Sequence, residues 1–163
     1  MVGYRWYEAR NVQPVFPFGH GLSYTTFTYT DLNATPSTNA QGATVLKVDY
    51  TITNAGTRAG KEASQVYLTL PAEAAEPSKR LVGFQKVELQ PGQSQRVSVT
   101  IDCAASHHPF SYFRPADESD LKAWANGDWV TPNGQFTVHV GTSSAQTPLQ
   151  SPVALSLTGC LSS

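Results

Sequence analysis

The chain has 163 residues, of which 40% are hydrophobic and 14% are charged, and its formal net charge is -1. A chain of this length allows one domain with a real hydrophobic core. The balanced charge leaves no basic field for nucleic acid, so neutral partners such as sugars or another protein surface fit best. No stretch approaches the roughly 20 apolar residues that cross a bilayer, so we expect no membrane partner.

The first residues lack the apolar core of a secretory signal. We therefore expect the chain to start at a cut within a longer protein rather than at a natural secretory N-terminus. The abundance of aromatic, threonine, serine and valine residues favours strands over helices. Only residues 121–125 resemble a helical turn.

Segments with apolar residues at alternate positions, the period of a strand with one buried face, recur along the chain. Turn residues separate them: Asn54-Ala55-Gly56, then Pro71, then Pro91-Gly92. In chain order the segments are Phe27 to Tyr29, 44–54, 64–70, 80–89, 97–101, 136–140 and 153–157. About seven strands predict an all-β, immunoglobulin-like sandwich of two antiparallel sheets.

A turn rich in aromatics and glycine, Phe16-Pro17-Phe18-Gly19-His20-Gly21-Leu22-Ser23-Tyr24, precedes the first strand. With Tyr4-Arg5-Trp6-Tyr7 upstream, it resembles the junction that leads into the C-terminal fibronectin type III-like domain of family 3 glycoside hydrolases, the β-glucosidase and β-xylosidase family. Further blocks are similar to that family in the same order: residues 48–62, 65–68, 80–87, 89–92 and 133–141. Residues 101–130 are longer and more aromatic than the family's usual segment.

The resemblance implies a fibronectin type III-like sandwich over residues 27–163, with residues 1–26 as an extended connecting segment. It also implies a non-catalytic accessory module whose partners are the catalytic domains of a β-glucosidase-like parent enzyme, located outside the cell or in the periplasm. The family's nucleophile and acid/base residue lie outside this module, so we expect the chain alone not to hydrolyse glycosides. We expect no cofactor.

The chain's own residues give few signs of catalysis. Glycosidic cleavage needs a pair of carboxylates, but Asp117, Glu118 and Asp120 stand in a polar loop where solvation explains them. His107 and His108 point in opposite directions on an extended chain and cannot easily share a metal ion. An independent hydrolase is therefore a weak third hypothesis, because no convergent polar pocket is evident.

The second hypothesis is a free-standing module that binds carbohydrate or a lignocellulose surface. Exposed aromatic rings stack on sugar rings, and the candidates are Tyr112, Phe113, Trp124 and Trp129. Packing at the end of the sandwich, or against another domain, is the interpretation we prefer for them.

Candidates for contact with a neighbouring domain lie in the connecting segment: Tyr4, Arg5, Trp6, Phe16, Phe18, His20 and Tyr24. Salt bridges across such a junction would involve Arg5, Arg10 and Glu8. His20 stands between two glycines, where its ring would hydrogen-bond locally to fix the turn.

Cys103 and Cys160 have no metal-ligand spacing around them. They form either a disulfide or two buried free thiols, and the sequence leaves both open. The sequon Asn33-Ala34-Thr35 would carry a glycan only in a eukaryotic secreted protein.

Overall fold

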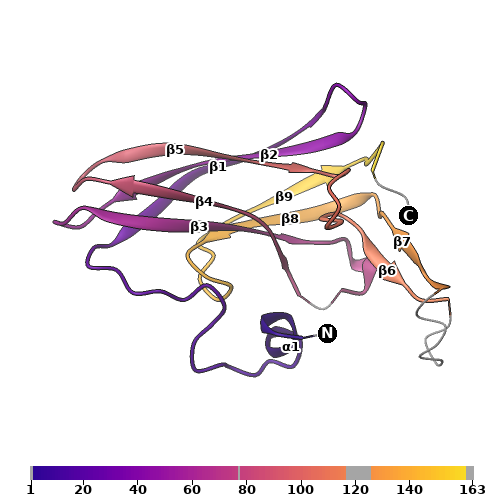
Figure 1. Cartoon of the computed structure of the whole chain (residues 1–163), viewed down its shortest axis with the longest axis horizontal. Helices are drawn as coiled ribbons and strands as arrows, with labels where there is room; N and C mark the ends of the chain where they lie inside the picture. The colour runs from indigo at the N-terminus through magenta and orange to yellow at the C-terminus, as the bar shows by residue number, and fades with distance from the viewer. Residues whose placement is uncertain (1, 77, 117–125, 161–163) are drawn as a thin grey trace.

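The computed structural model describes residues 2–76, 78–116 and 126–160, and their fold is a β-sandwich (Figure 1). The helices that the structure describes in full are α1 (Tyr4–Ala9) and the 3-10 turn η1 (Ala72–Ala74). Its strands are β1 (Phe27–Thr38), β2 (Thr44–Asn54), β3 (Gly60–Thr69), β4 (Arg80–Leu89), β5 (Ser94–Asp102), β6 (Tyr112–Arg114), β7 (Asp128–Val130), β8 (Gly134–Gly141) and β9 (Leu149–Leu155).

Two antiparallel sheets form the sandwich. One has the strand order β1-β2-β5 and the other β4-β3-β8-β9. These seven strands are the predicted ones, so the predicted fold class is confirmed. A separate hairpin, β6-β7, projects from one end (Figure 1) and was not predicted. The residues 121–125, expected to form a helical turn, lie outside the described residues, as do Asp117, Glu118 and Asp120.

The core lies between the two sheets and follows the alternation of the sequence. In β2, Leu46, Val48, Tyr50 and Ile52 are fully buried. They face the inward side chains of the other sheet, such as Val66, Leu68, Phe136 and Val138. Two tyrosine hydroxyls enter this core with partners, as buried polar groups must: Tyr50 Oη lies 2.7 Å from Ser64 Oγ, and Tyr29 Oη donates to Glu62 Oε1 at 2.7 Å.

The Asn-x-Gly turn after β2 has a clear physical purpose. The fully buried Asn54 donates from Nδ2 to the carbonyls of Arg58 at 2.7 Å and Leu89 at 3.0 Å. Its Oδ1 accepts from Thr25 Oγ1 at 2.6 Å and from the amide of Gly56 at 3.1 Å. One side chain therefore joins the entry of β1, the β2-β3 turn and the end of β4.

The segment before β1 begins with the short helix α1, which was not predicted, and then continues without helix or strand to Phe27. The helix ends in a Schellman motif. The backbone amide of Asn11, which has a φ of 51°, donates to the Glu8 carbonyl at 3.1 Å, and the backbone amide of Val12 donates to the Tyr7 carbonyl at 2.9 Å. Asparagine tolerates this left-handed conformation better than most residues. The segment then runs below the outer face of the β4-β3-β8-β9 sheet (Figure 1).

Cys103 and Cys160 form a disulfide, which decides between the two states left open by the sequence. Their Cα atoms lie 4.7 Å apart, although 57 residues separate them in the chain. The bond ties the end of β5 to the segment that follows β9. The buried Cys103 thereby closes one end of the sandwich.

Candidate inter-domain docking surface

The segment before β1 is anchored to the sandwich by an aromatic stack. The Tyr4 ring lies 4.9 Å from the Phe18 ring in a stacked arrangement and meets the edge of the Tyr67 ring at 5.9 Å. The backbone amide of Leu81 donates to Tyr4 Oη at 2.7 Å. Tyr67 points away from the core, yet it is fully buried. The segment therefore covers this part of the sheet as a second, smaller apolar layer.

The aromatic-glycine turn is held at its centre by Gln65 of β3. Gln65 Nε2 donates to the Gly19 carbonyl at 3.3 Å and to the Thr142 carbonyl at 2.7 Å. The Ser144 amide donates to the Phe18 carbonyl at 2.8 Å. Gly19 has φ of 81°, and a Cβ atom there would collide with the Gln65 side chain. Glycine is therefore required for both its conformation and its small size.

Ion pairs fix α1 to Glu76 and Lys79, which lie just before β4. Glu8 pairs with Lys79 at 3.2 Å, and Glu76 pairs with both Arg5 and Arg80, the latter at 3.2 Å. Burial, followed by the charge of Arg5, lowers the pKa of Arg80 to about 10, so its guanidinium stays charged at neutral pH. The Arg5 and Glu8 bridges predicted across a domain junction thus form within this chain, and Arg10 has no ion pair among the described residues.

The segment before β1 also carries many exposed apolar side chains. The side chains of Leu22, Tyr24 and Val15 are 95%, 92% and 90% exposed. The Phe16 ring is exposed as well and stacks on the His20 ring at 5.1 Å, while the His20 amide donates to the Pro17 carbonyl at 3.0 Å. The nine large hydrophobic side chains exposed in this segment are Val2, Trp6, Tyr7, Val12, Val15, Phe16, Phe18, Leu22 and Tyr24, here called the docking surface.

The predicted contact residues therefore divide into two groups. Tyr4 and Arg5 pack within the chain, whereas Trp6, Phe16 and Tyr24 face solvent. Phe18 does both, because it stacks on Tyr4 and remains half-exposed. Sequence reasoning missed Val2, Tyr7, Val12, Val15 and Leu22, although Tyr7 and Leu22 lie inside the motifs that were recognised.

Three of the four predicted carbohydrate-binding aromatics, Tyr112, Phe113 and Trp129, lie in the β6-β7 hairpin. The Trp129 ring stacks on the His108 ring at 4.1 Å with an interplanar angle of 7°, and the Phe113 edge meets Trp129 at 5.7 Å. One face of the indole is therefore already covered, and Tyr112 and Phe113 are half-buried. This geometry favours packing at the end of the sandwich. Trp124 lies outside the described residues.

The carboxylates near the sheet face are engaged by neighbours. Glu8 and Glu76 form ion pairs, and Glu62 accepts the hydrogen bond from Tyr29. Burial raises the pKa of Glu62. Burial, and then the charge of Lys79, lowers the pKa of His139 to about 4, so this imidazole is neutral at neutral pH. In the part of the chain that the structure describes, no helix is long and apolar enough to span a bilayer.

Comparison with known proteins identifies the class of domain first. The family model of the fibronectin type III-like domain matches residues 62–144, which span β3 to the loop after β8. The chain therefore belongs to the fibronectin type III-like domain family.

Its relatives are β-glucosidases. Thermostable beta-glucosidase B of Acetivibrio thermocellus is 35% identical over 158 residues, which cover 96% of this chain and 19% of the relative. Beta-glucosidase 3B from Thermotoga neapolitana, solved in complex with alpha-D-glucose, superposes with a TM-score of 0.78 at 36% identity and covers 94% of this chain. D2-BGL from Chaetomella raphigera gives a TM-score of 0.77 at 34% identity.

The chain spans about a fifth of the length of these relatives, 19% in the first two cases and 22% in the third. It thus corresponds to a domain-sized part of a β-glucosidase. The family resemblance drawn from the sequence motifs is confirmed.

Proposed function

We propose that this chain is a non-catalytic accessory module of a β-glucosidase-like enzyme and that its docking surface holds it against the catalytic domains. The observation that carries the proposal is the distribution of exposed apolar side chains. Nine of the ten large ones among the described residues lie in the segment before β1, and the tenth is Phe84. A concentration of exposed apolar side chains marks an interaction site in a soluble protein.

The relatives support this role, because this chain matches only about a fifth of the length of each, and the remainder is long enough to hold the acid and nucleophile of glycosidic cleavage. The disulfide supports a location outside the cell or in the periplasm, where such bonds persist. The parent enzyme would act on plant oligosaccharides or polysaccharides. The segment before β1 would connect the catalytic domains to the sandwich, and the sandwich would support those domains.

The test replaces the matching region of the Acetivibrio thermocellus enzyme with this chain and follows thermal inactivation of its activity on an aryl glucoside. Leu22 and Tyr24 are more than 90% exposed, so the double variant L22S/Y24S should leave the melting temperature of the isolated chain unchanged. In the chimaera the same variant should weaken domain contact by about 3–6 kcal/mol, since each fully buried large side chain contributes about 1.5–3 kcal/mol.

The matched control is Phe84→Ser, because Phe84 is 69% exposed on β4 and outside the docking surface. The proposal fails if L22S/Y24S inactivates no faster than the unsubstituted chimaera, or if Phe84→Ser has the same effect. The isolated chain should not hydrolyse aryl glucosides. Hydrolysis that a point mutation in this chain abolishes would show that the module is itself catalytic.

A further inference from the structure

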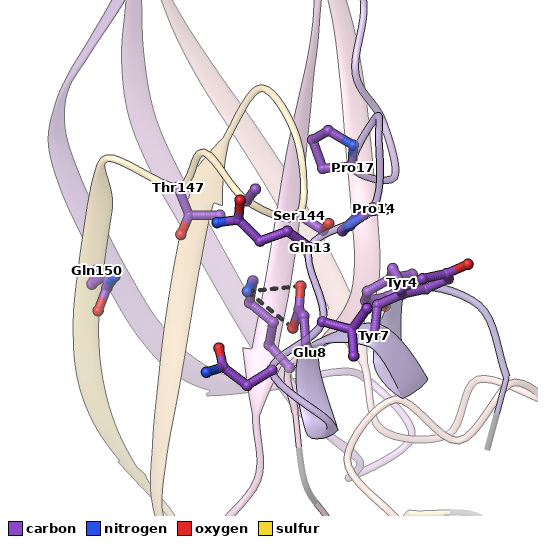
Figure 2. Close-up of a pocket in the computed structure, with 13 residues that line it drawn as sticks. Tyr4, Tyr7, Glu8, Gln13, Pro14, Pro17, Ser144, Thr147 and Gln150 are labelled. Carbon is purple, nitrogen blue, oxygen red and sulfur yellow. Dashed lines mark hydrogen bonds and ion pairs between the residues drawn. The ribbon is translucent and has the colours of Figure 1, made fainter.

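A groove of about 480 Å³ separates the segment before β1 from the β8-β9 loop and strand β9. Figure 2 shows Gln13 and Glu8 on the side of the segment, with Thr147 and Gln150 on the opposite side. The groove lies on the outer face of the β4-β3-β8-β9 sheet, away from the core. Its volume falls within the range of sites that bind small molecules, about 300–1,000 Å³.

Local structure explains why polar side chains line this groove. The Schellman motif at the end of α1 places Asn11 and Gln13 just after the helix, in an exposed part of the chain. On the opposite wall, Gln150 pairs with His139, which alternates with the buried Val138 and Val140. Gln150 therefore points outward from the sheet, into the space beside the segment.

The charges in the groove cancel. Glu8, labelled in Figure 2, and Lys79 both line the groove and are paired at 3.2 Å, with side chains that are 25% and 17% exposed. Both carboxylate oxygens of Glu8 accept from Lys79 Nζ at 3.2 Å. An anionic or cationic ligand would have to break this pair to gain a counter-charge. A neutral ligand would leave it intact.

Several polar side chains that line the groove, by contrast, can still form hydrogen bonds. Among the described residues, the side-chain amides of Asn11, Gln13 and Gln150 and the hydroxyl of Thr147 make no hydrogen bond within the chain. Each amide supplies both a donor and an acceptor. Apolar surface lies beside them in Tyr7, Val12, Pro14 and Pro17, and Tyr7 keeps 38% of its surface exposed.

We propose that this groove binds a neutral sugar of one or two rings. A sugar ring presents hydroxyls around its edge, which need paired donors and acceptors, and C–H faces, which pack on aromatic and aliphatic surface. The groove offers both, with no net charge. The site differs from the β6-β7 hairpin, where the indole of Trp129 already has one face covered by His108. Tyr7 and Val12 belong to both the groove and the docking surface, so the two proposed sites share these side chains.

The test is a titration of the isolated chain with cellobiose, followed by NMR signals of the side-chain NH2 groups. We expect millimolar binding, with the largest shifts at Asn11, Gln13 and Gln150. Gln13→Ala and Gln150→Ala should each weaken binding about 3- to 10-fold, the loss of one or two hydrogen bonds. The control Gln95→Ala removes an exposed glutamine on β5, in the other sheet, and should change nothing.

Sorbitol, an acyclic polyol, should bind at least 5-fold more weakly than cellobiose, because it has no rigid ring face to pack against Tyr7 and Val12. The proposal is overturned if no amide signal moves at high sugar concentration. It is equally overturned if the shifts centre on Trp129, or if both groove variants bind as tightly as Gln95→Ala. Because no catalytic domain is present in the tube, sugar bound in an active site cannot produce the signal.

Discussion

Removing the disulfide should cost this chain a large share of its stability. The bond closes a loop of 57 residues between Cys103 and Cys160. In the chain-entropy model, a cross-link over a loop of this length raises the free energy of the unfolded state by about 4 kcal/mol. Small domains have a total unfolding free energy of about 5–15 kcal/mol. Cys160→Ser should therefore remove a large part of the unfolding free energy and leave the chain only marginally stable.

Urea unfolding followed by tryptophan fluorescence measures this difference, with the reduced unsubstituted chain as the control. Reduction and Cys160→Ser should lower the unfolding free energy by similar amounts, because both open the same loop. The partly buried position of Cys160 limits any packing loss from the substitution itself. A loss below about 1 kcal/mol, or two free thiols titrated in the native oxidised chain, would refute the reasoning.

Three further predictions concern the sheet's two faces. Gly19→Ala should destabilise by about 1–3 kcal/mol, while Gly21→Ala, where an added Cβ meets nothing within 4 Å, should be neutral in the same melting experiment. Burial raises the pKa of Glu62, so the contribution of this side chain to stability is lost as pH rises through its folded pKa. Glu62→Gln can still accept the hydrogen bond from Tyr29, so its unfolding free energy should exceed that of the parent at pH 7 and equal it in acid. Burial holds the pKa of His139 at about 4 against 6.5 unfolded, so only the unfolded state gains a proton between these values; stability should fall by about 1–2 kcal/mol on acidification through this window, and His139→Gln should flatten the slope of unfolding free energy against pH.

The sandwich could be predicted because its strands repeat a simple pattern. Leu46, Val48, Tyr50 and Ile52 alternate with polar residues, and burial of one face is what that alternation encodes. The β6-β7 hairpin could not be found in this way, since its strands have three residues each and three residues show no period. The length and the aromatic content of residues 101–130 were the signs that this region departs from a simple connection.

Helix α1 was missed for a related reason. It has six residues, its N-cap Gly3 makes no side-chain capping bond, and no acidic residue lies in its first turn. Isolated helices this short are unstable in water, so tertiary contacts must hold it. Those contacts are the edge contact of Tyr4 with Tyr67 and the ion pairs of Arg5 and Glu8, and in each case the partner lies more than 60 residues away in the chain.

One feature of β3 did signal the covered outer face. Val66 and Leu68 point into the core, so Tyr67 between them must point outward, and a large aromatic ring at an outward position gains little unless another element packs on it. Gln65 repeats the pattern on the same side of the strand, since its amide reaches Gly19 of the turn. From the sequence, contact between β3 and the aromatic-glycine turn could have been predicted only by combining the alternation in β3 with the aromatic residues of the turn.

This arrangement also bears on how the domain would meet a partner. A flexible linker must lose its conformational freedom on docking, which subtracts from the affinity. Here Tyr4 and Gln65 already hold the segment against the sheet, so Phe16, Leu22 and Tyr24 are presented from a chain that is fixed in advance. The same three side chains make little contact with the sandwich. Their burial would therefore contribute almost in full to the free energy of docking. Within one short segment, the anchoring residues hold the chain on the sheet and the docking surface would bind the partner.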